Sequence, residues 1–318
     1  MTALELEPKY MKPKIVVVGS SNTDMIIQLD RIPRPGETIL GGQFTMAAGG
    51  KGANQAVAAA RAGGEVTLVA RLGKDLFSEN AIGGFSRDGI GINHLVRDPK
   101  CPSGVALIFV SKAGENSIAV ASGANARLAA SDVRKARPAI ESADLVLMQL
   151  EVPLPAIKAA VELARKKGKT VILNPAPAQP LPDALLSQIQ IVTPNETEAG
   201  QLTGMVVDSD ASAAKAARIL LAKGIQIAII TLGARGAWVA TAEGKAERVP
   251  GFKVQPVDTT AAGDVFNGAL VVALGEGAPL LQAVRFANAA AAISTTRLGA
   301  QPSAPKRTEI DRFLKIPN

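Results

Sequence analysis

The feature that most constrains this chain is the regular alternation of short β-branched runs with longer helical segments. The apolar runs predict strands over residues 14–19, 66–70, 145–150, 170–174, 191–193 and 227–232. Helices are predicted over residues 51–61, 76–88, 155–167, 211–222, 263–273 and 280–296. Strands that are separated by helices form βαβ units. The sequence therefore predicts an α/β fold, with a mainly parallel central sheet and helices on both faces.

The composition agrees with one large α/β domain. Hydrophobic residues make up 47% of the 318 residues and aromatic residues only 3%, which suits buried parallel strands covered by Ala-rich helices. No linker or repeat divides the chain, so we predict one domain over residues 13–318. Residues 1–12 lack the pattern of a signal peptide and are predicted to be a disordered extension. No apolar run is long enough for a membrane helix, and we expect a cytoplasmic location.

The scarcity of cysteine and histidine excludes several kinds of chemistry. Cys101 and His94 are the only residues of their types, so an internal disulfide, a Cys-rich zinc site and an HExxH site are excluded. We expect His94 to lie near the start of a strand, in a structural role. Catalysis must therefore rest on carboxylates, amides, hydroxyls, lysine and backbone N–H groups.

Positive charge is dispersed along the chain. The net charge is +7, and the densest cluster, residues 165–169, closes a predicted helix, where cations suit the helix dipole. No aromatic residues alternate with this cluster, as a nucleic-acid surface would require. Gly168-Lys169-Thr170 matches the end of a phosphate-binding P-loop, but Leu163 replaces its first glycine and the order is helix then strand. We expect an anionic small molecule as the partner, with no nucleic acid and no membrane.

Two segments interrupt the alternation of strands and helices. Residues 25–48 contain short extended pieces around a Pro-Arg-Pro-Gly turn, and residues 103–122 have the pattern of a β-hairpin. Neither segment contains a predicted helix. We predict that together they form a small β-sheet outside the main sheet, which serves as a lid or as a dimer surface.

A turn of small residues near the C-terminus leads directly into a predicted helix. Residues 258–268 read Asp-Thr-Thr-Ala-Ala-Gly-Asp-Val-Phe-Asn-Gly. The free N–H groups and the positive dipole at the start of a helix can hold an oxyanion. Asp264 in the first turn is either a residue that stabilises the dipole or a general base beside that anion hole. We favour the general base, because phosphoryl transfer to a hydroxyl needs this combination.

Three further motifs lie where predicted strands end or helices begin. Residues 49–55, Gly-Gly-Lys-Gly-Ala-Asn-Gln, and residues 19–24, Gly-Ser-Ser-Asn-Thr-Asp, are either tight turns with solvated side chains or binding sites for the hydroxyls of a polyol. Residues 193–198, Thr-Pro-Asn-Glu-Thr-Glu, open another helix. Acidic residues are common in a first helical turn, but Glu198 can also hold Mg²⁺ through water. The sequence leaves these interpretations open.

Taken together and in this order, the motifs resemble those of the ribokinase (PfkB) family of carbohydrate kinases. The resemblance extends from about Lys14 to Leu314. Its most specific parts are residues 49–55, 148–151, 174–178, 193–198 and 258–264. It implies a kinase that uses ATP to phosphorylate D-ribose at the 5-hydroxyl, giving D-ribose 5-phosphate and ADP.

The resemblance also implies roles for individual residues. Asp264 would be the catalytic base, beside an anion hole formed by the backbone of Ala261, Ala262, Gly263 and Asp264. The residues implied to hold ribose are Asn22, Asp24, Gly50, Lys51, Asn54, Glu151 and Asp264. Those implied to contact ATP and, through Glu198, Mg²⁺ are Asn195, Glu198, Thr231, Gly233, Arg235, Gly236, Gly263 and Asn288. Those implied to hold a K⁺ ion are Asp258, Thr260, Ser294, Arg297, Gly299 and Ser303.

The resemblance further implies that the two irregular segments close over the sugar and pair two subunits into a homodimer. Most members of the family have Gly where Ala261 stands, so we expect this turn to avoid a conformation that only Gly tolerates. Asn288 stands where some members have His. The first alternative is a kinase for deoxyribose, a nucleoside or another sugar, and the second is a sugar-binding protein without activity. Asp264 argues against the second, because a binding protein needs no base.

Overall fold

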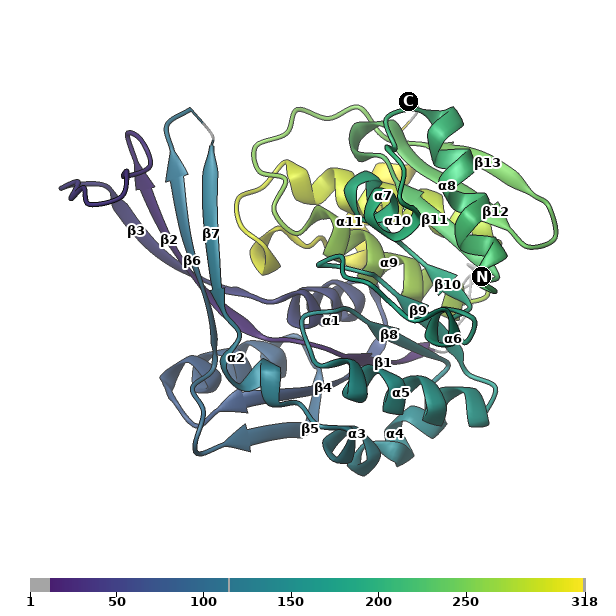
Figure 1. Cartoon of the computed structure of the whole chain (residues 1–318), viewed down its shortest axis with the longest axis horizontal. Helices are drawn as coiled ribbons and strands as arrows, with labels where there is room; N and C mark the ends of the chain where they lie inside the picture. Colours follow the sequence, from purple (N-terminus) through teal and green to yellow (C-terminus); the bar gives the residue numbers. More distant parts are fainter. Residues whose placement is uncertain (1–11, 114, 317–318) are drawn as a thin grey trace, which may run out of the picture.

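The centre of the fold is a nine-stranded sheet with the order β13-β12-β11-β10-β9-β8-β1-β4-β5 (Figure 1). The structure, a computed structural model, describes residues 12–113 and 115–316, so the predicted extension falls almost wholly outside the described residues. The strands of this sheet are β1 (Lys14–Val18), β4 (Glu65–Gly73), β5 (Gly91–Asp98), β8 (Leu145–Met148), β9 (Thr170–Leu173), β10 (Ile191–Val192), β11 (Ile227–Thr231), β12 (Gly236–Thr241) and β13 (Ala246–Pro250). Neighbouring strands from β5 to β11 are parallel, while β12 and β13 are antiparallel additions at one edge.

Helices cover both faces of this sheet. They are α1 (Lys51–Ala62), α2 (Leu76–Arg87), α3 (Ala130–Lys135), α4 (Arg137–Ser142), α5 (Leu154–Lys166), α6 (Asp183–Leu186), α7 (Glu196–Thr203), α8 (Asp210–Ala222), α9 (Ala262–Gly275), α10 (Leu280–Thr295) and α11 (Arg307–Leu314). Ile15 and Val17 of β1 pack with α1, α9 and α10, whereas Val16 and Val18 pack with α5 and α8 on the opposite face. Strands that are buried on both faces give continuous apolar runs. The predicted α/β fold is confirmed.

The predicted strands and helices are all present, with ends that shift by a few residues. β12, β13, α3, α4, α6 and α11 were not predicted as elements, and β5 was indicated only through the expected place of His94 near the start of a strand. β13 is exposed at four of its five residues, so it lacks the apolar run by which a buried strand is found. His94 lies inside β5.

A second sheet stands apart from the main one and projects from it in Figure 1. It consists of β2 (Asn22–Leu29), β3 (Gln43–Gly49), β6 (Gly104–Ser111) and β7 (Asn116–Ala121), in the order β3-β2-β6-β7. We call these four strands the lid. β2 and β6 pair in parallel, which joins the two irregular segments of the sequence into one sheet.

The lid begins earlier than the sequence indicated. Asn22 and Asp24 were expected in a loop after the first strand, but they are the first and third residues of β2. The expectation was wrong because the chain turns from β1 into the lid within only three residues, Gly19 to Ser21. The two side chains are therefore part of the lid itself.

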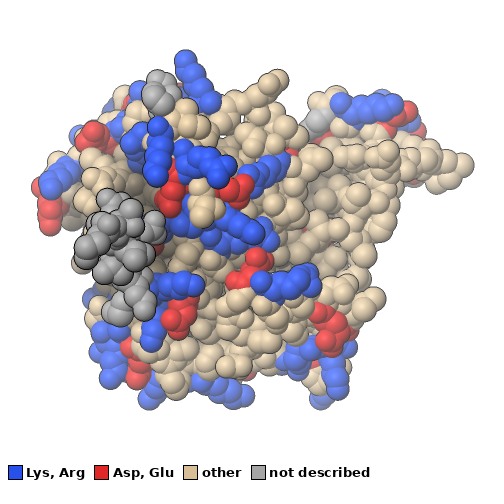
Figure 2. Space-filling model, turned by 180° about the vertical axis from the view of Figure 1, so that it is seen from behind, with Lys and Arg blue, Asp and Glu red and all other residues tan. Residues whose placement is uncertain are grey.

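The surface of the main body carries dispersed charge. Figure 2 shows Lys and Arg side chains spread over one face, with Asp and Glu side chains among them. Among the helices of the described chain, none combines the length and the apolar character that a membrane span requires.

Candidate active site

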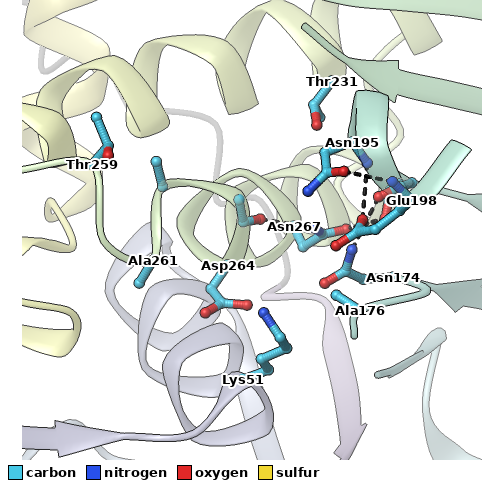
Figure 3. A pocket seen from close by; sticks show the side chains of 13 residues that line it. Lys51, Asn174, Ala176, Asn195, Glu198, Thr231, Thr259, Ala261, Asp264 and Asn267 are labelled. Atoms are coloured by element: carbon cyan, nitrogen blue, oxygen red, sulfur yellow. Dashed lines mark hydrogen bonds between the residues drawn. The ribbon is translucent and has the colours of Figure 1, made fainter. Parts of the chain in front are cut away.

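A cavity of about 170 Å³ lies at the carboxyl ends of the central parallel strands. Asn174 follows β9, Thr193 follows β10 and Thr231 ends β11, so three adjacent strands deliver polar side chains to one edge of the sheet. The remaining lining residues come chiefly from the starts of α1, α7 and α9 (Figure 3): Lys51, Ala176, Asn195, Glu198, Thr259, Ala261, Ala262, Gly263, Asp264 and Asn267. We call this the first cavity.

A second cavity, of about 360 Å³, lies at the base of the lid. Its lining combines lid residues with the segments that follow β7, β8 and β9: Asn22, Val120, Ser122, Asn125, Ala126, Leu150, Glu151, Val152, Pro153, Leu154, Pro177 and Gln179. The backbone N–H of Lys51, from the first cavity, donates to Oε2 of Glu151 at 2.9 Å, so the two cavities adjoin. Among the residues predicted to hold the sugar, Asn22 and Glu151 line the second cavity and Lys51 and Asp264 line the first, while Asp24, Gly50 and Asn54 are in neither described lining. The residues predicted to form the anion hole line the first cavity.

Asp264 lies in the first turn of α9 and is only 6% exposed. Its Oδ2 accepts a hydrogen bond from Nδ2 of Asn54 at 3.0 Å, and its Oδ1 accepts one from Nε2 of Gln55 at 2.9 Å. Burial raises the pKa of Asp264, against the opposing effects of Lys51 and the two amide donors. In Figure 3 the side chains of Lys51 and Asp264 point toward each other. A buried carboxyl with a raised pKa at the edge of a cavity is suited to accept a proton.

Three carboxylates face one lysine at the boundary of the two cavities, and a fourth, Asp24, faces two of these carboxylates. Burial works against the charge of Lys51, but Asp264, Glu151 and Glu198 outweigh it and raise the pKa of the ammonium group. Glu151 is fixed by hydrogen bonds from the hydroxyl of Ser20 at 2.5 Å and from the N–H of Lys51. Burial, followed by repulsion from Glu151 and Asp264, raises the pKa of Asp24 to about 6. The cluster is therefore suited to bind hydroxyl donors and a group that carries negative charge next to Lys51.

The turn before α9 corrects one expectation from the sequence. Ala261 has φ 58° and ψ 12°, in the left-handed region that we expected this turn to avoid. It is the one residue other than glycine with positive φ in the described part of the chain. In this conformation the chain turns from residues 258–260 into α9, and the first N–H groups of the helix border the first cavity. The structure therefore holds Ala261 in a conformation that costs about 1–2 kcal/mol relative to glycine.

Ala261→Gly is expected to raise the free energy of unfolding by about 1 kcal/mol. Glycine relieves the left-handed strain, and this gain exceeds the roughly 0.4–1 kcal/mol that a more flexible unfolded chain costs. Urea unfolding measures the difference. The matched control is Ala262→Gly, one residue later and already helical, which is expected to lower stability. Equal losses in both variants would contradict a strained Ala261.

The predicted nucleotide contacts divide into two groups. Asn195, Glu198, Thr231 and Gly263 line the first cavity. Asn195 caps α7 through a reciprocal pair of hydrogen bonds with Glu198, so both also have a structural role. Burial, the largest effect, raises the pKa of Glu198.

The second group of predicted nucleotide contacts, Gly233, Arg235, Gly236 and Asn288, lies outside the described lining of the first cavity. The guanidinium of Arg235 pairs with Glu196 at 2.7 Å and with Asp210 at 3.1 Å. Nδ2 of Asn288 donates to the carbonyl oxygens of Val249 and Pro250, at 3.2 and 3.1 Å. Arg235 therefore connects its turn to α7 and α8, and Asn288 connects α10 to β13. Contact of these residues with a nucleotide stays a prediction.

Two of the predicted potassium residues, Thr260 and Gly299, are brought together by Asp258. Its Oδ1 accepts from the N–H of Thr260 at 2.9 Å, and its Oδ2 accepts from the N–H of Gly299 at 2.8 Å. Burial works against the charge of this carboxyl, but the hydrogen bonds from Thr260 and Gly299 outweigh burial and lower its pKa. Ser294 and Ser303 donate their hydroxyl hydrogens to carbonyls of their own turns, which leaves their oxygens as acceptors.

The remaining predicted potassium residue, Arg297, forms an ion pair with Glu309. Across the described residues there is no group of three or more His, Cys, Asp or Glu side chains that could hold a metal ion.

Several polar residues of the site received no role from the sequence. Gln55, Gln149 and Asn174 lie within motifs that were noticed, but buried amides give no separate signal of their own. Asn267 is buried in α9, where its Nδ2 donates to the carbonyl of Gly263 at 2.8 Å and its Oδ1 accepts from the hydroxyl of Thr193 at 2.6 Å. A polar residue inside an otherwise apolar helix is the signal that could have identified it.

Comparison with known proteins places this geometry in context. The sequence matches the family described as pfkB family carbohydrate kinase over residues 12–307. A Haemophilus influenzae protein named ribokinase is 47% identical over 305 residues, which cover 96% of this chain and 99% of the relative. A Salmonella typhimurium protein named deoxyribokinase is 37% identical over 303 residues, which cover 95% of this chain and 99% of the relative.

The solved structures agree with the sequence relatives. The structure of Arabidopsis thaliana ribokinase complexed with ribose and ATP has a TM-score of 0.90 and 32% sequence identity, and the match covers 96% of this chain and 100% of that chain. A ribokinase-like α/β fold with a small second sheet is thus confirmed. The chain belongs to the pfkB family of carbohydrate kinases.

Proposed function

We propose that this chain transfers the γ-phosphoryl group of ATP to the 5-hydroxyl of D-ribose, giving D-ribose 5-phosphate and ADP. The observation that carries the proposal is Asp264, a buried carboxylate in the first turn of α9 that lines the cavity bordered by helix starts, which itself adjoins a polyol-sized cavity. The relatives named ribokinase, and the related structure complexed with ribose and ATP, support this choice of substrates.

Asp264 is the proposed general base, which accepts the proton of the 5-hydroxyl as its oxygen attacks the γ-phosphorus atom. The bond between that phosphorus and the bridging oxygen of ADP breaks, and ADP leaves. The backbone of Ala261, Ala262, Gly263 and Asp264 is the proposed anion hole, because the start of a helix offers free N–H groups and a positive dipole. Positioning and charge stabilisation of this kind are what phosphoryl transfer needs.

The proposed ribose site lies where the lid meets the main sheet. Its residues are Asn22, Asp24, Gly50, Lys51, Asn54, Glu151 and Asp264. Asn22 and Asp24 offer an amide and a carboxylate from one strand, which suits two neighbouring hydroxyls of a sugar. Because both belong to the lid, movement of the lid over the sugar would bring its ligands with it and exclude competing water.

The residues at the two proposed cation sites fit the ions. Glu198 accepts one hydrogen bond, from the N–H of Asn195, and its other oxygen has no partner among the described residues, which suits Mg²⁺ held through water. Asp258 links Thr260 to Gly299, and its charge together with the oxygens of Ser294 and Ser303 suits a K⁺ ion beside the anion hole. When bound, these ions would neutralise phosphate charge and hold the shape of the turn.

The lid is also the proposed surface of a homodimer. Large apolar side chains of the lid segments are between 48% and 91% exposed: Leu40, Phe44, Met46, Leu107, Ile118 and Val120. The strand register sets Met46 and Leu107 beside Met25, on the face opposite to Asp24. In Figure 2 most of the lid is free of charged side chains. Sedimentation velocity of wild type and of Leu107→Glu tests this: the wild type should sediment as a dimer and the variant as a monomer.

We also propose a cytoplasmic location, where ATP is available.

Asp24 gives the proposed ribose site a dependence on pH. Sugar hydroxyls donate most strongly to an ionised carboxylate, and the pKa of Asp24 is raised to about 6. The KM for ribose is therefore expected to rise by about tenfold between pH 7.5 and pH 5, as the carboxyl takes up a proton, while the KM for ATP stays nearly constant. Asp24→Asn should raise the KM at pH 7.5 and remove its pH dependence. An unchanged KM profile in Asp24→Asn would exclude Asp24 as a sugar ligand.

The experiment that tests the proposed function is release of ADP from Mg-ATP in the presence of D-ribose, with and without potassium. Turnover that depends on ribose and rises with potassium supports both the substrate and the cation site. Turnover with 2-deoxyribose or a nucleoside, but not with ribose, would overturn the choice of substrate and favour the activity named in the Salmonella typhimurium relative or a nucleoside kinase. Sugar binding without turnover on any of them would overturn the kinase activity itself.

A further inference from the structure

A chain of buried amide side chains leads to the proposed base. Gln55 lies at its centre, with no exposed surface. Its Nε2 donates to Oδ1 of Asp264 and to Oδ1 of Asn174, both at 2.9 Å. Its Oε1 accepts from Nε2 of Gln149 at 2.5 Å. Gln55 therefore uses both of its N–H groups and its carbonyl inside the protein, and it has no group left for a ligand.

The direction of each amide in this chain is fixed by one backbone carbonyl. Nδ2 of Asn174 donates to the carbonyl oxygen of Thr193 at 3.0 Å, and a carbonyl can only accept. Asn174 must therefore present its Oδ1 to Gln55. Gln55 must in turn present its N–H groups to Asn174 and Asp264, because the reversed amide would set oxygen against oxygen at both contacts. The carbonyl of Thr193, which follows β10, thus determines that an N–H group of Gln55, and not its oxygen, faces the carboxylate of Asp264.

The surroundings of Asp264 make this contact important. The charged groups that face it are Lys51 of α1, which attracts it, and three carboxylates that repel it: Glu151 after β8, Asp24 of β2 and Glu198 of α7. Asn54 holds Oδ2, and Gln55 holds Oδ1. Each carboxylate oxygen keeps a second acceptor position, which remains available to a substrate hydroxyl.

We propose that Gln55 is a positioning residue of the phosphoryl-transfer reaction, which fixes the plane of the Asp264 carboxylate and directs its remaining acceptor positions to the substrate hydroxyl. This inference rests on the proposed function, in which Asp264 is the base. Gln55 does not touch the substrate. It acts through Asp264, and Gln149 and Asn174 hold it in place.

Two variants of Gln55 test the proposal. Gln55→Glu keeps the shape but replaces the donor with a carboxylate, and Gln55→Met keeps the approximate volume but removes both hydrogen-bonding groups. Each is expected to lower kcat at pH 7 by at least about tenfold, with little change in the KM for ATP. The acid limb of the pH profile of kcat/KM should move up by about one pH unit, more in Gln55→Glu, because Asp264 loses a donor that favours its ionised form. Activity should recover as the pH is raised.

The matched control is Gln190→Met. Oε1 of Gln190 accepts from the backbone N–H of Val171 at 2.9 Å, so this substitution also removes a partly buried glutamine contact, but away from the site. We expect it to change stability alone. A Gln55 variant that lowers kcat and leaves the acid limb in its wild-type position would overturn the proposal, since that result marks a structural role only.

A second readout does not need turnover. Asp264 binds its proton more tightly in the folded chain than in the unfolded chain, so its contribution to stability falls as the pH rises from the unfolded pKa to the folded pKa. In Gln55→Met, urea unfolding should show that this fall in stability extends to higher pH than in the wild type. The difference between Gln55→Met and the wild type should vanish when both proteins also carry Asp264→Asn. A difference that persists in the presence of Asp264→Asn overturns the inference. Absence of kinase activity in the wild type, by contrast, would count against the proposed function only.

Discussion

Asp264→Asn is expected to lower turnover by at least about 100-fold at saturating sugar and ATP. The asparagine amide has nearly the same shape but cannot accept the hydroxyl proton. It also offers one acceptor oxygen where two donors, from Asn54 and Gln55, now meet the carboxylate. Steady-state kinetics of the purified variant measure the loss. A variant that keeps near-full activity would remove Asp264 as the base.

The same substitution should leave the fold intact or make it more stable. Burial raises the pKa of Asp264, and Glu151 adds repulsion, so the ionised carboxylate is held at a cost to the folded state. The matched control is Asp98→Asn at the end of β5, an aspartate that is 2% exposed and paired with Arg71 at 2.8 Å. This substitution removes the ion pairs of Asp98 with Arg71 and Arg127 and is expected to lower stability. We therefore expect Asp264→Asn to be stable and inactive, and Asp98→Asn to be destabilised but active per folded molecule.

Gly52→Ala is expected to lower kcat/KM for the sugar by about 100-fold and the free energy of unfolding by about 1–3 kcal/mol. A Cβ at Gly52 would lie 2.5 Å from the backbone nitrogen of Ser20 and 2.6 Å from the carbonyl carbon of Gly19. Backbone cannot yield as a flexible side chain can, so the start of α1 must move away from the segment after β1. That movement displaces Lys51, and with it the cluster at the boundary of the two cavities.

The control for this substitution is Gly83→Ala in α2. There the nearest atom to a new Cβ is Nη1 of Arg87 at 3.5 Å, which is ordinary contact. Because alanine favours a helix over glycine by about 1 kcal/mol, this variant should be at least as stable as the wild type, with unchanged kinetics. Urea unfolding and sugar kinetics of the two variants are compared directly. Equal behaviour of the two would show that α1 does not depend on its close approach to Ser20.

The fold could be predicted largely because its strands are buried on both faces. Runs such as residues 14–18 give a continuous apolar signal, and the helices between them fix the parallel arrangement. β13 lacks this signal because it is an edge strand that is exposed at four of its five residues. β12 is mostly buried, but its sequence, Gly-Ala-Trp-Val-Ala-Thr, is rich in small residues and contains no run of large β-branched ones. The start of β2 was missed for a different reason. Asn22 and Asp24 are polar and resemble a loop, although they pair with β3 and β6.

The site could be predicted where a motif is contiguous, as in residues 258–264 and 49–55. The sequence does not reveal contacts that join distant segments. The hydrogen bonds from Gln149 to Gln55, and from Gln55 to Asp264, connect residues that only the folded sheet brings together. Ala261 was misjudged because a side chain was taken to exclude the left-handed region, whereas the surrounding turn holds it there.

The parallel pairing of β2 with β6 has a consequence for the order of folding. Asn22 pairs with Gly104 only after α1, β4, α2 and β5, which lie between them in the chain, have brought the two segments together. Contacts so far apart in the chain are slow to form, because the loop must close before the pairing stabilises it. β1 and β8 of the main sheet pair across an even longer stretch of chain, so both sheets depend on the same closure of the segment between them. The strand that carries Asn22 and Asp24 is therefore complete in its pairing only when the chain from α1 to β5 has folded back beside it.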